Sequence, residues 1–117
     1  STWGHTVFLT SDHGSIMVTK PVQVKGDRKT STGIRYKYGQ NINMPDKTGL
    51  TIPDPEGYFL PKHDMNTNYL IAKSVNFFIY PNEYHKFANR YKNSFQHGGI
   101  SLEEMVVPIA ELKGKNA

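Results

Sequence analysis

The sequence contains no cysteine, which excludes disulfide bonds, thiolate metal sites and cysteine nucleophiles and fits a reducing compartment. No apolar run approaches the ~20 residues that a membrane-spanning helix needs. No charged, then apolar, then small-residue leader precedes the first apolar segment. We therefore expect a cytoplasmic protein without membrane insertion.

The chain has 117 residues, of which 37% are hydrophobic and 21% are charged. This balance is too apolar for an intrinsically disordered segment, and the length fits one domain at most. A chain of this size buries roughly two thirds of its unfolded surface, which is enough for a modest core.

The net charge of +4 is concentrated in one segment, residues 20–37. Its basic residues, opposed only by Asp27, are Lys20, Lys25, Arg28, Lys29, Arg35 and Lys37. The segment suits a phosphorylated or polyanionic partner, or it is an ordinary solvated basic hairpin. In either case we expect Lys25, Arg28, Lys29 and Arg35 on a flexible, exposed hairpin arm, because unpaired charges are costly to bury.

The spacing of apolar residues, glycines and prolines predicts a mixed α/β layer. The expected elements are a buried strand over 6–10, an edge strand or two short strands over 16–24, a basic turn at 26–33, a strand over 34–38, a long loop over 41–64, a hairpin or long strand over 68–80, an amphipathic helix that Asn82 caps and that stops before Gly98, a short turn of helix at 101–104 and a last strand to residue 112. The short turn is predicted because Ser-Leu-Glu-Glu fits a capping box.

Two motifs place imidazole and carboxylate groups at the ends of expected core elements. Asp12 and His13 directly follow the first strand, and Gly14 supplies the backbone freedom that lets both side chains turn to one site. His97 stands in the same way before two glycines. Aspartate and histidine suit zinc or manganese, and ligands collect at the carboxyl ends of strands in open α/β sheets. We therefore expect Asp12, His13 and His97 to converge, although each motif alone is also typical of an ordinary surface.

The PglZ domain, a branch of the alkaline phosphatase superfamily, has two hallmark segments that this chain resembles. They are VFLTSDHG at 7–14 and SFQHGGISLEEMVVPIAEL at 94–112. The second is the more specific, because His-Gly-Gly-x-Ser-x-Glu-Glu before a Val-Pro strand is rarely met elsewhere. GIRYKYG at 33–39 is similar to the basic segment that follows the first motif in that family. Over essentially its whole length the chain is most similar to the C-terminal part of PorX-type two-component response regulators of Bacteroidetes, in which a receiver domain is joined to a PglZ effector.

The resemblance implies a partial alkaline-phosphatase-like mixed sheet, to which the pattern adds a projecting β-hairpin and one amphipathic helix. It implies two zinc ions in the complete domain, with manganese as the alternative. Asp12 and His13 would be ligands of one ion and His97 of the other. Arg35, and more loosely Arg28, are candidates to face substrate phosphate on the basis of charge and position. The implied activity is that of a phosphodiesterase or phosphatase acting on a phosphoester, with nucleotides or oligonucleotides as expected substrates, coupled to two-component signalling.

The chain departs from the superfamily pattern at its start. The motif that supplies a Ser or Thr nucleophile, and a further Asp and His, lie ahead of the Asp-His pair in these enzymes. We therefore expect residues 1–117 to be the C-terminal portion of a single PglZ-type domain, inactive alone, with neither Ser11 nor Ser101 as nucleophile. Its expected partners are the remainder of that domain, a receiver domain and, alternatively, a second copy.

Two other function classes stay open. One is a non-catalytic signalling or dimerisation module whose basic hairpin docks an acidic partner. The other is nucleic-acid binding, for which Tyr36 and Tyr38 beside the basic cluster are available for stacking but no binding motif is present. The metal content of the full-length parent distinguishes an enzyme from a signalling module.

Overall fold

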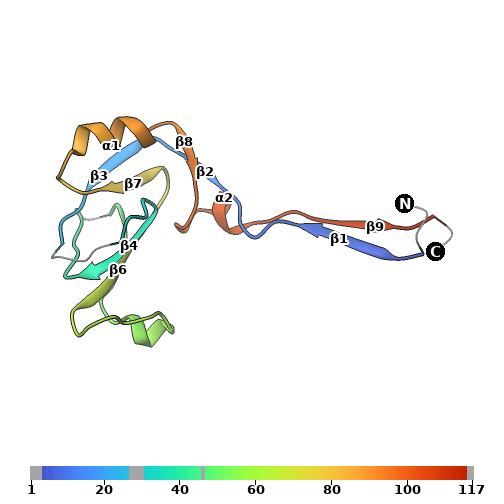
Figure 1. Ribbon diagram of the computed structural model, residues 1–117, viewed down its shortest axis with the longest axis horizontal. Helices are drawn as coiled ribbons and strands as arrows, with labels where there is room; N and C mark the ends of the chain where they lie inside the picture. The colour runs from blue at the N-terminus through green and yellow to red at the C-terminus, as the bar shows by residue number, and fades with distance from the viewer. Residues whose placement is uncertain (1–3, 27–30, 46, 116–117) are drawn as a thin grey trace.

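The computed structural model describes residues 4–26, 31–45 and 47–115 (Figure 1). In chain order the elements are β1 (Thr6–Thr10), β2 (Ile16–Val18), β3 (Lys20–Gln23), β4 (Tyr36–Gln40), β5 (Gly49–Ile52), the 3₁₀ helix η1 (Pro55–Tyr58), β6 (Thr67–Ala72), β7 (Asn76–Ile79), α1 (Tyr84–Tyr91), β8 (Ser94–Gln96), α2 (Leu102–Met105) and β9 (Ile109–Lys113). None of the helices in these residues is long and apolar enough to cross a membrane.

The strands form several small sheets rather than one large sheet. β4, β6 and β5 make an antiparallel sheet in that order, β3 pairs with β7 in parallel, and β2 pairs with β8 and β1 with β9 in antiparallel. The expected mixed α/β class is thus confirmed. The expected basic hairpin is wrong, because β3 and β4 each pair with another strand. Pairing β3 with β7 buries Val22 beside Phe78, whereas a projecting hairpin would leave that valine in water.

The core lies on both sides of β7, because neighbouring residues of a strand point to opposite faces. On one face Phe78 packs with side chains from β3 and β6, which are Val22, Leu70 and Ala72, and with Val24 and Ile42. On the other face Phe77 packs with Val18 and Ile34. The predicted apolar stripe of α1 covers this second cluster with Tyr84, Phe87 and Tyr91.

The pair β1–β9 extends away from these sheets as a two-stranded arm (Figure 1). We call this pair the ribbon, and we call the rest of the described chain from β2 to α2 the body. The ribbon gives the molecule its elongated dimensions of 60 × 33 × 23 Å. Every residue of both ribbon strands is exposed. The first strand was expected to be buried, but within the described residues nothing covers either of its faces.

Several local expectations are corrected. The segment 41–64, expected to be a loop, holds β5 and η1. The sequence does not indicate β5 because only Ile52 of this strand is buried, so its apolar pattern is weak. Glu83 rather than Asn82 precedes α1. The helix ends at Tyr91 because Lys92 takes a non-helical ψ of 134°, and Asn93 then has a positive φ of 63°. The following residues form β8 instead. The capping box at Ser101 is confirmed.

Candidate functional site

The two motifs that the sequence singles out meet at the junction of ribbon and body. The antiparallel pairing of β2 with β8 places Ile16 opposite Gln96, so the residues that flank these strands are neighbours. The rings of His13 and His97, 84 positions apart in the sequence, stack with centroids 3.5 Å apart and planes inclined by 14°. The predicted convergence of His13 and His97 is confirmed, and Asp12 lies beside His13.

The ring of His13 is oriented by its own backbone. Its Nδ1 lies 2.6 Å from the carbonyl oxygen of Gly14, and because a carbonyl only accepts, Nδ1 carries the proton. In metal-binding histidines the nitrogen that does not donate to a carbonyl is the one that coordinates the metal, and Nε2 has that position here. Nε2 lies 3.5 Å from Oδ1 of Asp12. Two ligands of one tetrahedral zinc ion lie about 3.3 Å apart, so the Asp12–His13 pair has the spacing of ligands to one ion.

His97 cannot easily share that ion. The lone pairs of two parallel stacked rings lie in parallel planes and do not meet at one point. Two stacked rings are therefore better suited to different ions than to one shared ion. Within residues 4–26, 31–45 and 47–115 no group of three His, Asp or Glu side chains is arranged to hold a metal ion. The carboxylate of Asp12 and the imidazoles of His13 and His97 are donor types that fit zinc or manganese. A complete site needs further ligands.

Backbone contacts fasten the first motif to the second. The amide of Gly14 donates to the carbonyl of Glu104 over 2.8 Å. A side chain at position 14 would overlap the backbone carbonyl of Glu103, so only glycine permits this approach. The imidazole of His13 therefore stands at a fixed place relative to α2.

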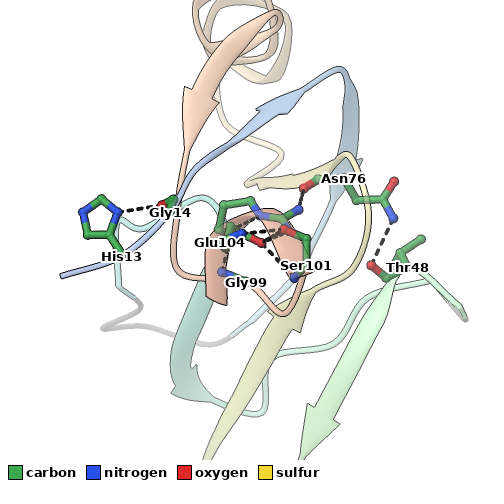
Figure 2. Close-up of polar contacts among 8 residues, drawn as sticks. His13, Gly14, Thr48, Asn76, Gly99, Ser101 and Glu104 are labelled. Atoms are coloured by element: carbon green, nitrogen blue, oxygen red, sulfur yellow. Dashed lines mark hydrogen bonds and ion pairs between the residues drawn. The ribbon is translucent and has the colours of Figure 1, made fainter. Parts of the chain in front are cut away.

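Glu104 is the buried anchor of the second motif (Figure 2). Arg35 donates to its two carboxylate oxygens from Nε over 2.8 Å and from Nη2 over 2.6 Å. The amides of Gly99 and Ser101 donate to the same carboxylate over 2.9 and 3.0 Å. Burial would raise the pKa of Glu104, but the hydrogen bonds from Arg35, Ser101 and Gly99 outweigh it and lower the pKa to about 2. The carboxylate thus holds the loop after His97 against Arg35, the residue that precedes β4.

The structure gives Arg35 different partners from the substrate phosphate expected of it. Its side chain is 0% exposed, and Nη1 donates to the carbonyl of Asn76 in addition to the two bonds with Glu104. The expectation that Arg35 belongs to an exposed arm is wrong, because Glu104 supplies the paired charge that makes its burial possible. Arg28 and Lys29 lie outside the described residues. Lys25 is exposed as expected.

The paired glycines of the second motif have separate structural reasons. Gly98 has a φ of 109°, which other residues rarely adopt. A Cβ on Gly99 would lie 2.5–2.7 Å from the guanidinium of Arg35, so the loop approaches this side chain too closely for any larger residue. Gly98 therefore serves the conformation of the loop beside Tyr36, and Gly99 serves the packing of the loop on Arg35.

Sequence reasoning missed the role of Glu104. The sequence did indicate a local role for it, because Glu104 is the last residue of the Ser-x-x-Glu capping box. Its side chain does accept a hydrogen bond from the amide of Ser101. What the pattern did not reveal is that a basic residue 69 positions earlier completes the cluster. Ser101 is itself buried, and its hydroxyl donates to the carboxylate of Glu104.

The comparison with curated proteins found no match to the chain. The comparison with protein families matched residues 1–112 to PglZ, described as the BREX system PglZ alkaline phosphatase-like domain. The matched range includes the Asp-His pair, the buried arginine and the whole second motif. The chain therefore belongs to the PglZ family of alkaline phosphatase-like domains.

Proposed function

We propose that the chain is the metal-ligand-bearing C-terminal part of a phosphoester hydrolase domain, of phosphodiesterase or phosphatase type, acting on nucleotides or oligonucleotides. The observation that carries this proposal is the stacking of His13 on His97 beside Asp12. An alkaline phosphatase-like family supports the reaction class, and the donor set at the junction supports the use of divalent ions.

Asp12 and His13 would hold one ion through Oδ1 and Nε2, and His97 would be a ligand of the second. Zinc is the proposed metal, with manganese as the alternative. When bound, the two ions lower the pKa of an attacking hydroxyl and stabilise charge on the transferred phosphoryl group. The chain's own contribution is orientation. The carbonyl of Gly14 fixes the ring of His13, and the Glu104 cluster fixes the loop that carries His97.

The ribbon supports the proposal that residues 1–117 are part of a larger domain. Val7 and Leu9 share one face with Ala110 and Leu112, so that face is entirely apolar, and it is exposed. A two-stranded ribbon is marginally stable alone, and both outer edges of this one carry unpaired backbone groups. We propose that the remainder of the PglZ domain covers the ribbon and supplies the nucleophile and the further ligands.

We also propose that this domain is the effector of a two-component regulator, coupled to a receiver domain. The support is the resemblance of the chain, over essentially its whole length, to the C-terminal part of PorX-type response regulators. The non-catalytic module is less well supported, because its basic docking arm loses Arg35 and Lys37, which are both buried. Lys20 and Lys25 are the members of that cluster that are exposed within the described residues.

The test uses the protein that carries the complete domain, with zinc content measured by mass spectrometry and turnover measured on a chromogenic phosphodiester. We expect two zinc ions per chain in the wild type. His97→Ala should lose one ion and lower turnover at least about 100-fold. His85→Ala is the matched control, since His85 is exposed on α1, and it should change neither quantity.

Two outcomes would contradict the proposal. Full zinc content and turnover in His97→Ala would remove the assignment of this histidine. A wild-type protein with two zinc ions but no turnover on mono- or diesters would favour the non-catalytic signalling module. The 117-residue chain alone is expected to show no turnover, and activity that is lost in Ser101→Ala would overturn the proposed position of the nucleophile.

A further inference from the structure

A pocket of about 320 Å³ lies between the strands of the body and α1, apart from the histidine pair. Phe87 and Tyr91, one turn apart on α1, form one wall, and Ile34, Phe78 and Ile79 contribute further apolar surface. This volume is at the lower end of the range for small-molecule sites, which are mostly apolar with a few placed polar groups. The pocket shares no residue with the site formed by Asp12, His13 and His97.

Lys37 is the charged residue that lines this pocket. It is only 2% exposed, and its Nζ lies 4.0 Å from the centre of the Tyr80 ring, which also lines the pocket. No carboxylate of the described residues forms an ion pair with it. Burial lowers the pKa of Lys37 to about 8, which shows how poorly its surroundings replace water around the ammonium.

The contrast with Arg35, two residues earlier on the chain, makes this lysine unusual. Both side chains are buried, but Arg35 has Glu104 as a bidentate counter-charge and Lys37 has an aromatic face alone. A cation over a ring gains part of the energy that it loses on leaving water. An anion brought into the pocket would supply more of it, because a buried charge that gains a paired partner is penalised less than an unpaired one.

We propose that the pocket binds a small organic anion with a flat aromatic body, whose negative group lies on Nζ of Lys37. The aromatic walls of Phe87, Tyr91 and Tyr80 suit a ring system through stacking and edge contacts. The volume admits one such molecule and excludes a folded peptide. The apolar lining disfavours a bare inorganic phosphate, since little besides Lys37 would replace its lost hydration.

This inference does not depend on the proposed hydrolase activity, because it uses neither the metal ligands nor the ribbon. The probe is 2-naphthoate, and its neutral analogue 2-naphthamide has the same ring without the charge. Both are titrated into the full chain by NMR. We expect naphthoate to bind and to give intermolecular contacts with the rings of Phe87 and Tyr91.

The variant Lys37→Met should lower the affinity for naphthoate by about 10-fold or more while changing that for naphthamide less than about 2-fold. Lys73→Met is the matched control, since Lys73 is exposed, and it should change neither affinity. Equal loss of both probes, or naphthoate that binds unchanged to Lys37→Met, would overturn the proposal. The ring-to-ring contacts are measured in the wild type, so contacts at any other surface would overturn it even if the variant failed to fold.

Discussion

The body of the molecule buries the aromatic side chains of β7 completely, whereas the ribbon exposes a comparable residue to water. Phe77 and Phe78 of β7 are 0% exposed, while Phe8 of β1 is 64% exposed. Because the body contains its own core, its internal contacts are sufficient to hold half of the site. The ribbon delivers Asp12 and His13 to the junction, but nothing within the described residues covers it. The loop that carries His97 is thus held by the buried Glu104 cluster, whereas the segment that carries His13 is held to the body through the hydrogen bond from Gly14 to Glu104.

The largest expected effect comes from breaking the anchor on the body side. Glu104→Ala would leave the buried guanidinium of Arg35 with the carbonyl of Asn76 as its remaining partner. An unpaired buried charge is strongly destabilising, so the free energy of unfolding should fall by roughly 3 to 5 kcal/mol. Urea unfolding of this variant beside Glu103→Ala provides the measurement. Glu103 is the exposed neighbour on α2, and its removal should change stability by less than about 0.5 kcal/mol.

The same anchor gives an acid dependence with a definite sign. The pKa of Glu104 is lowered in the folded state to about 2, so its contribution is fully present above its ordinary pKa of 4.5. That contribution is lost as the pH falls from 4.5 towards 2. The double variant Arg35→Met/Glu104→Leu, an apolar replacement of the pair, should lose less stability over this interval. Equal acid sensitivity of wild type and double variant would contradict the assignment.

The next effect tests how closely the loop after His97 must pack on the anchor. Gly99→Ala introduces a Cβ 2.5–2.7 Å from the guanidinium of Arg35, so the arginine or the loop must move. Overpacking of this kind costs about 1 to 3 kcal/mol, again measured by urea unfolding. Gly57→Ala is the control, because its Cβ would lie 3.6 Å from Asp54, which is ordinary contact. Similar stability of the two variants would show that the side chain of Arg35 moves aside without lowering the free energy of unfolding.

Sequence reasoning predicted the convergence of His13 and His97 better than it predicted the sheets. The two histidines were identifiable because a glycine follows each of them at the end of an expected core element, and Asp12 directly precedes His13. The pairing of β3 with β7 was not identifiable from the sequence. The periodicity of a strand indicates which of its faces is buried and not which strand lies beside it. The prediction that Arg35 is exposed was wrong for a related reason. Burial of Arg35 depends on Glu104, far along the chain, and the sequence around Arg35 carries no sign of it.

The smallest expected effect in this chain is the one that most sharpens the comparison between ribbon and body. Phe8→Ala removes a side chain that is already largely in water, so stability should change by less than about 0.5 kcal/mol. Phe78→Ala is the reference for the body and should cost about 3 to 5 kcal/mol. In the protein that carries the complete PglZ domain, we expect the cost of Phe8→Ala to rise to about 2 kcal/mol or more, because burying a Phe contributes about that much. If the cost stays below 0.5 kcal/mol there, the ribbon is not covered by the remainder of the domain. A cost that instead grows with protein concentration would identify a second copy as the cover.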